Sequence, residues 1–165
     1  MRIVLGVDPG FGSTGYGVIG LEGSRLRHIA HGVITTSPQL QAGKRLLLIA
    51  ESMRSVAREF SPHEASVESI FLSRNARSAM SVAQARGVVL LVLAEHGIVS
   101  YDYSPLVIKK AVVGNAKADK QQVQEILRML FGFEQKPTPT HAADALAAAV
   151  CHANTASYRE RTDDQ

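Results

Sequence analysis

The sequence predicts an α/β fold in which a mixed, five-stranded sheet is flanked by helices. Three strand-like apolar runs come first, and strand and helix patterns then alternate, which is the order expected for such a sheet. The chain has 165 residues, of which 45% are hydrophobic and 20% are charged, a composition typical of one globular domain. We expect this domain to span residues 1–157 and a polar tail over 158–165 to be disordered.

Each predicted strand is a short apolar run bounded by turn residues. Residues 2–7 form a continuous run with β-branched members, and the next two runs join as a hairpin near Glu22-Gly23. The predicted strands are 2–7, 16–21, 28–35, 65–70 and 98–103.

Each predicted helix shows either apolar residues at spacings of three and four or a recognisable start or stop signal. Ser61-Pro62 ends the first helix, and Gly97 ends the second. Thr138 is the expected N-cap of the last helix, with Pro139 in its first position. The predicted helices are 40–60, 74–96, 105–112, 118–131, and 138 to about 154.

Charge and cysteine content limit the partners and the location of the protein. The net charge is +3, and between residues 69 and 120 seven Lys or Arg stand against three acids. Such a basic segment permits a nucleic-acid partner. The one cysteine, Cys151, cannot form an internal disulfide, and no apolar run reaches the length of a signal-peptide core or a membrane span. We therefore expect a cytoplasmic protein without a membrane partner.

Residues 10–15 (GFGSTG) match the G-x-G-x-x-G pattern of dinucleotide-binding proteins, but their context does not. That function requires a helix directly after the turn and an acid about 20 residues later. Here a predicted strand follows, and no acid lies between Gly23 and Leu48. Actin-like ATPases also begin with Asp-x-Gly after a first strand, but they need two lobes and a much longer chain. A tight hairpin turn explains the glycines better.

Carboxylates end two of the predicted strands. Asp8 closes the first strand, and Glu68 follows an apolar stretch in the fourth. An acid in this position is costly to desolvate unless a cation or a donor meets it. On the last helix, His141 and Asp144 share one face, among alanines that allow close approach to the sheet. Each residue alone could be a turn cap, a solvated charge or a partner of the helix dipole. Together they predict one shared metal site.

The residue types at this site suggest the chemistry. Clustered carboxylates repel one another, and a divalent cation relieves the repulsion. Oxygen-rich ligation suits Mg²⁺ or Mn²⁺, and two such ions can activate water and stabilise the leaving oxygen of a phosphodiester. We therefore predict a metal-dependent endonuclease with two ions per active site, whose catalytic and metal-binding residues are Asp8, Glu68, His141 and Asp144.

Five ordered motifs cover most of the chain. They are GVDPGFGSTGYGVI (6–19), VESIFLSRNARSAMSVAQARG (67–87), Pro105 with KKAVVG (109–114), ADKQQVQ (118–124) and HAADALAAAVCH (141–152). At these separations, residues 2–155 resemble the RuvC family of crossover junction endodeoxyribonucleases, the Holliday junction resolvases of bacteria. The resemblance implies a ribonuclease-H-like fold and two symmetric nicks in a four-way DNA junction during recombination and repair.

The same resemblance implies partners and metal ligands. It implies a homodimer and a branch-migration helicase complex of the RuvA–RuvB type. The small residues of the helix at 74–96 suggest that this helix lies at the two-fold interface. Asp8, Glu68 and Asp144 match the acidic ligands of the family. Three residues before Asp144 the family usually has an acid, whereas this chain has His141, which could be a ligand, a general base or both.

Residues that face DNA are implied as well. Phe71 matches an aromatic residue that acts on bases, and Lys109 and Lys120 match residues that contact phosphate. Arg74 and Lys117, from the same basic segment, complete the predicted DNA-binding set. Phe71 could instead belong to the core, and a single lysine is usually a solvated charge. For Lys109 and Lys120, the concentration of basic residues in one segment and the family resemblance favour contact.

Two alternatives stay open. The same fold could cut another substrate, such as an RNA–DNA hybrid. Alternatively, the histidine at position 141 could mark a junction-binding module whose catalytic site has decayed.

Overall fold

The computed structural model describes residues 1–70 and 76–163 and confirms a mixed five-stranded sheet with helices on both faces. The strands are β1 (Arg2–Asp8), β2 (Ser13–Glu22), β3 (Arg25–Thr35), β4 (Glu64–Glu68) and β5 (Val99–Tyr103). The helices are α1 (Ala42–Phe60), α2 (Ala76–Glu95), α3 (Pro105–Val113), α4 (Lys120–Phe131) and α5 (Thr140–Asp163).

The strand order is β3-β2-β1-β4-β5. The first three strands form an antiparallel meander, as predicted, while β4 and β5 run parallel to β1. Parallel strands need crossover connections, and helices α1 and α2 supply them. The parallel half of the sheet therefore brings the C-terminal ends of β1, β4 and β5 to one edge of the molecule.

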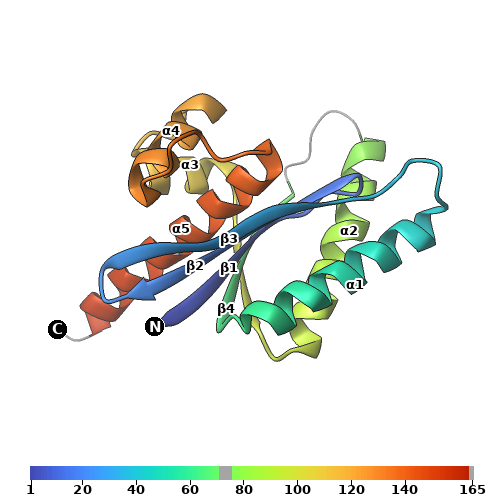
Figure 1. Ribbon diagram of the computed structural model, residues 1–165, viewed down its shortest axis with the longest axis horizontal. Helices are drawn as coiled ribbons and strands as arrows, with labels where there is room; N and C mark the ends of the chain where they lie inside the picture. The colour runs from blue at the N-terminus through green and yellow to red at the C-terminus, as the bar shows by residue number, and fades with distance from the viewer. Residues whose placement is uncertain (71–75, 164–165) are drawn as a thin grey trace.

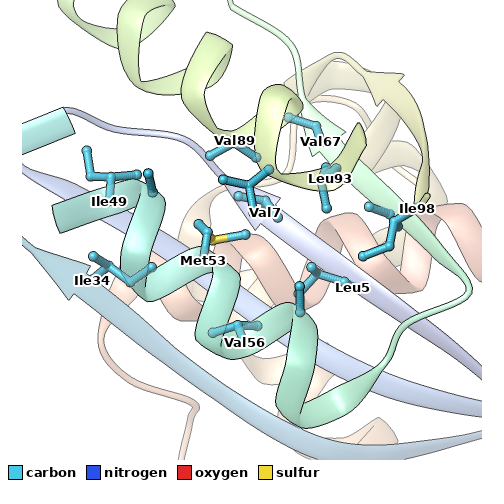
Figure 2. Close-up of a cluster of buried hydrophobic side chains, with 14 of the residues drawn as sticks. Leu5, Val7, Ile34, Ile49, Met53, Val56, Val67, Val89, Leu93 and Ile98 are labelled. Atoms are coloured by element: carbon cyan, nitrogen blue, oxygen red, sulfur yellow. The ribbon is translucent and has the colours of Figure 1, made fainter. Parts of the chain in front are cut away.

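Two apolar clusters bury the two faces of the sheet. Helices α1 and α2 cover one face, and α3, α4 and α5 cover the other (Figure 1). Figure 2 shows the first cluster, in which Leu5 and Val7 of β1 meet Met53 of α1 and Leu93 of α2. Because side chains alternate along a strand, the even-numbered residues of β1 point to the opposite face, toward α5.

Helix α5 lies close to the sheet because glycines face it. A Cβ atom on Gly6 would lie 1.9 Å from the carbonyl oxygen of Ala145, and one on Gly15 would lie 1.9 Å from that of His141. Alanines supply the helix side of this contact, and Ala142, Ala143 and Ala145 are fully buried. The first two turns of α5 are thereby held against the ends of β1 and β2.

The limits of several elements differ from the prediction. Helix α5 begins at Thr140, so Thr138 is not its N-cap, and the Pro139 carbonyl accepts the backbone N–H groups of Ala142 and Ala143. The helix also runs to Asp163 rather than ending near Asn154, since neither glycine nor proline interrupts that stretch. Strands β2 and β3 both begin three residues earlier than predicted. Strand β3 begins early because its pairing with β2 extends to Arg25, close to the turn at Gly23, and β2 begins early because Ser13 pairs with Thr35 at the other end of the same ladder.

Candidate active site

The four residues predicted from the sequence to form the active site line one pocket of about 240 Å³. Asp8 and Glu68 are the last residues of β1 and β4. These strands pair in parallel with Val7 opposite Val67, so the next residue of each strand brings the two carboxylates side by side. His141 and Asp144 reach the same place from the first turns of α5.

The side chains of Asp8, His141 and Asp144 form the tightest part of the site. Each offers one ligand atom, and these atoms all lie within 4.8 Å of one another. His141 Nδ1 lies 2.8 Å from Asp8 Oδ2. When Asp8 is ionised, this nitrogen carries a proton and donates a hydrogen bond to the carboxylate, which leaves the lone pair on Nε2 for a metal ion or a second proton.

Each carboxylate of the site makes ionisation of the others less favourable. Burial raises the pKa of Glu68 to about 8, and the nearby charges of Asp8 and Asp144 act in the same direction. A hydrogen bond between the Glu68 and Asp8 carboxyl groups also favours protonated Glu68. Burial likewise raises the pKa of Asp8, although its hydrogen bond with His141 opposes this effect. The positive charge of Lys120 opposes both shifts without outweighing them, so the site lacks enough positive charge to offset burial and the repulsion between its carboxylates.

A hard divalent cation would supply that charge. Carboxylate oxygens suit Mg²⁺ and Mn²⁺, and one imidazole nitrogen is compatible with Mn²⁺ in particular. The raised pKa of Glu68 favours a cation most directly, since a cation beside a buried carboxyl group would restore its ionisation. The donor atoms of Asp8, His141 and Asp144 would hold one ion, and Glu68 lies beside them.

Two of the predicted DNA-binding lysines, Lys109 and Lys120, also line the pocket. Lys120 Nζ lies 3.2 Å from Asp144 Oδ2, so in this structure the lysine pairs with a site carboxylate. Lys117 is exposed and does not line this pocket. Phe71 and Arg74 lie outside the described residues.

A second pocket, of about 280 Å³, adjoins the first and shares Asp8, Glu68, Pro105 and His141 with it. Ser78 and Ala79 of α2 form part of its wall. The sequence suggested these small residues only as packing positions, and nothing in their pattern pointed to the site. The two pockets together make a continuous depression from α4, across the carboxylates, to the start of α2.

The comparisons of this sequence with known proteins indicate the same family. The family model for "Crossover junction endodeoxyribonuclease RuvC" matches residues 4–152. A RuvC protein from Treponema denticola is 46% identical over 95% of this chain and 88% of its own length. One from Pseudothermotoga lettingae is 44% identical over 91% and 93%, respectively.

Solved structures agree with the sequence matches. Thermus thermophilus RuvC in complex with a Holliday junction substrate superposes with a TM-score of 0.92 at 35% identity, covering 96% of this chain and 97% of that one. The yeast mitochondrial Holliday junction resolvase Ydc2 gives a TM-score of 0.68 at 16% identity, covering 97% of this chain and 83% of its own, and so shares the fold.

Proposed function

Because the chain belongs to the RuvC family of crossover junction endodeoxyribonucleases, we propose that it resolves four-way DNA junctions with the site formed by Asp8, Glu68, His141 and Asp144. The observation that supports this most strongly is the convergence of these residues, from three separate elements, in one pocket. The products would be two symmetric nicks, as required for recombination and repair.

The proposed chemistry is hydrolysis assisted by two Mg²⁺ or Mn²⁺ ions. When bound, the ions supply positive charge to the attacking water and to the leaving oxygen. Asp8 and Asp144 would hold an ion together with Nε2 of His141, and Glu68 would lose its proton and join them. Asp8 orients the His141 ring through the 2.8 Å contact with Nδ1, which fixes the nitrogen that can bind a metal ion or accept a proton.

We propose that the scissile strand follows the two adjoining pockets. Lys109 and Lys120 stand on one side of the carboxylates, where they can contact phosphate, and Lys117 is exposed close by in sequence. The residues of the second pocket would accept the strand on the other side. Phe71 and Arg74 remain in the proposed DNA-binding set on the family resemblance alone.

A homodimer is part of the proposal, and the exposed face of α2 supports it. Met80 and Leu91 are 68% and 56% exposed, and between them Ala83 and Gly87 are exposed as well. The opposite face of α2 packs in the core through Val89 and Leu93. An apolar stripe with small residues at its centre is typical of a helix that packs against a partner.

Helix α2 is also, among the described residues, the one helix whose length and composition would allow it to span a membrane. Its Arg86 pairs with Asp102 at 2.6 Å, and four of its apolar side chains are buried in this fold. These contacts favour packing of α2 against protein rather than against lipid.

Sedimentation experiments test the homodimer. Gly87→Arg should yield monomer, while a control on α4, Met129→Arg, should remain dimeric. Monomeric wild-type protein at micromolar concentration would contradict the proposal.

The cellular setting is proposed from the relatives, which are bacterial proteins. A cytoplasmic location and a partner complex of the RuvA–RuvB type agree with such a role. Residues 1–157 would act as one domain, with 158–165 as a tail.

The experiment that tests the function compares substrates. Purified protein is incubated with a synthetic four-way junction, with an RNA–DNA hybrid and with linear duplex, each with EDTA, Mg²⁺ or Mn²⁺. We expect paired nicks in the junction that depend on the metal ion. Cleavage of the hybrid alone would favour the other substrate, and binding without cleavage under every condition would favour a non-catalytic module.

A further inference from the structure

We propose that Lys120 is a removable counter-charge: it holds the metal-binding carboxylate Asp144 until a substrate phosphate draws it away, so that substrate and metal ion strengthen each other's binding. This inference rests on the proposed function, and it concerns the order of events at the same site.

The first argument is the position of the ammonium group. Lys120 Nζ lies 3.2 Å from Asp144 Oδ2, and Asp144 contributes one of the three ligand atoms that lie within 4.8 Å of one another. An ammonium ion at hydrogen-bond distance from a ligand oxygen competes with a divalent cation for it. A cation bound at the same place would also repel the lysine.

The second argument is that Lys120 faces the whole cluster. It lines the same pocket as Asp8, Glu68 and Asp144, and its positive charge opposes the upward pKa shifts of Asp8 and Glu68. In the metal-free protein, Lys120 therefore provides part of the stabilisation that a metal ion would provide.

The third argument is that this contact can exchange at little cost. The backbone at Lys120 is fixed, because Asp119 and Gln122 form a capping box at the start of α4. The side chain beyond it is long and 64% exposed, whereas that of Asp144 is 23% exposed. Ion pairs with an exposed partner contribute little to stability, so a phosphate oxygen can replace Asp144 as the partner of Lys120.

These three points give a coupling mechanism. A phosphate in the pocket offers Lys120 a new anionic partner, which exposes Asp144 to the metal ion and removes the competing charge. Because coupling between two bound species is reciprocal, a metal ion on Asp144 must also favour the lysine on the phosphate. The site would then bind the metal ion more tightly when DNA is present than when it is absent.

Lys109 provides a matched control. It lines the same pocket, but among the described contacts it has no ion pair with a site carboxylate. If proximity of positive charge alone weakens metal binding, Lys109→Gln and Lys120→Gln should behave alike. If the contact with Asp144 matters, only the second substitution should have a large effect.

The test measures Mn²⁺ binding to the full-length, metal-free protein by titration calorimetry and by the electron paramagnetic resonance signal of free Mn²⁺. We expect Lys120→Gln to bind Mn²⁺ about fivefold to tenfold more tightly than the wild type. Lys120→Arg, which keeps the charge, should remain near the wild type, and Lys109→Gln should change the affinity by less than about twofold.

A second titration is made on the complex with a four-way junction, frozen rapidly after mixing and checked on a gel for intact DNA. Junction binding should increase the Mn²⁺ affinity of the wild type more than that of Lys120→Gln, by the factor found in the first titration.

An unchanged Mn²⁺ affinity in Lys120→Gln, or an equal gain in Lys109→Gln, would overturn the proposal. Circular dichroism melting curves establish that each variant is folded, and Lys120→Met replaces Lys120→Gln if the latter is not. Junction cleavage by the wild type is scored separately, so failure of the coupling and failure of the proposed function give different results.

Discussion

Strand β4 carries two glutamates on the same face, four residues apart, and they behave in opposite ways. Glu64 begins the strand and Glu68 ends it, so about 13 Å separates them. Burial alone would raise the pKa of Glu64, but hydrogen bonds with His152 and Arg2 outweigh it and lower the pKa. The pKa of Glu68 is raised to about 8.

The difference comes from the partners that the same elements supply at their two ends. At the beginning of β1 and β4, Arg2 pairs with Glu64, and His152 Nε2 of α5 lies 2.7 Å from the second carboxylate oxygen. Tyr103 completes this group, with its hydroxyl 2.8 Å from His152 Nδ1. At the other end, β1, β4 and α5 supply three acids, Asp8, Glu68 and Asp144. Their partners there are His141 of α5, which contacts Asp8, and the largely exposed Lys120 of α4, which contacts Asp144.

This comparison separates stability from function within one sheet. Where charges are matched, the network holds β1, β4, β5 and α5 together. Where acids outnumber their partners, burial and repulsion raise the pKa of Glu68 and lower stability, and the proposed metal ion would relieve this cost. The two ends can therefore be changed independently, and the predictions below use that independence.

The largest effect is expected for Asp8→Asn. The substitution removes a negative charge that we propose binds the metal ion and alters the contact that orients the His141 ring, so junction cleavage should fall by about a thousandfold or more. Junction binding should change little, because the lysines are intact. Cleavage is measured on a labelled junction and binding by fluorescence anisotropy in EDTA; if cleavage stays within about tenfold of the wild type, Asp8 is not a catalytic ligand.

The opposite end is tested by Glu64→Gln. Removing the carboxylate of a partly buried network leaves Arg2 and His152 without their anion, so the free energy of unfolding should fall by about 2 kcal/mol, less than for a fully buried pair. Because the folded-state pKa of Glu64 is lowered, its contribution is present above the ordinary value of 4.5 and is lost as the pH falls through the folded-state value. The two urea unfolding curves should therefore approach each other in acid, while cleavage per folded molecule is unchanged.

A smaller change of the opposite sign is expected for Glu68→Gln in the metal-free protein. A raised folded-state pKa means that ionisation of Glu68 destabilises the fold, progressively between pH 4.5 and about 8. The variant should be more stable than the wild type by about 2 kcal/mol at pH 9 and nearly equal to it at pH 4. Urea unfolding in EDTA measures this, and a destabilised variant at pH 9 would show that Glu68 has a favourable partner.

The sequence predicts the functional end of the sheet better than the structural end. Asp8 and Glu68 stand out because each follows an apolar run, and His141 and Asp144 because they share a helix face among alanines. Glu64 and His152 gave no such signal, since their pairing depends on the register of β1 with β4 and on how α5 crosses the sheet.

The pairing of Lys120 with Asp144 was also not predictable. A lysine in a basic segment suggests contact with DNA, and only the packing of α4 beside α5 reveals a carboxylate within reach. Helix α5 was misjudged at both of its ends: the Pro139 carbonyl, not Thr138, accepts the first N–H groups, and no breaking residue stops the helix after Asn154. The lysine pairing depends on tertiary contacts that local patterns do not encode, whereas the lack of a helix-breaking residue after Asn154 is readable in the sequence itself.

The smallest predicted effect is the release of a proton from Glu68 when a metal ion binds. It is specific to the end of the sheet that carries Asp8 and Glu68. At pH 7, a carboxyl group with a pKa of about 8 is mostly protonated, so metal binding should release close to one proton from Glu68. Calorimetric titration of Mn²⁺ in buffers of different ionisation enthalpy measures this number. It should fall toward zero at pH 9 and in Glu68→Gln, and it should be unchanged in Glu64→Gln, whose carboxyl group is already ionised in the wild type. If the number of released protons did not depend on pH, the two glutamates of β4 would not differ in their electrostatic surroundings. Any difference between the two ends of the sheet would then come from packing alone.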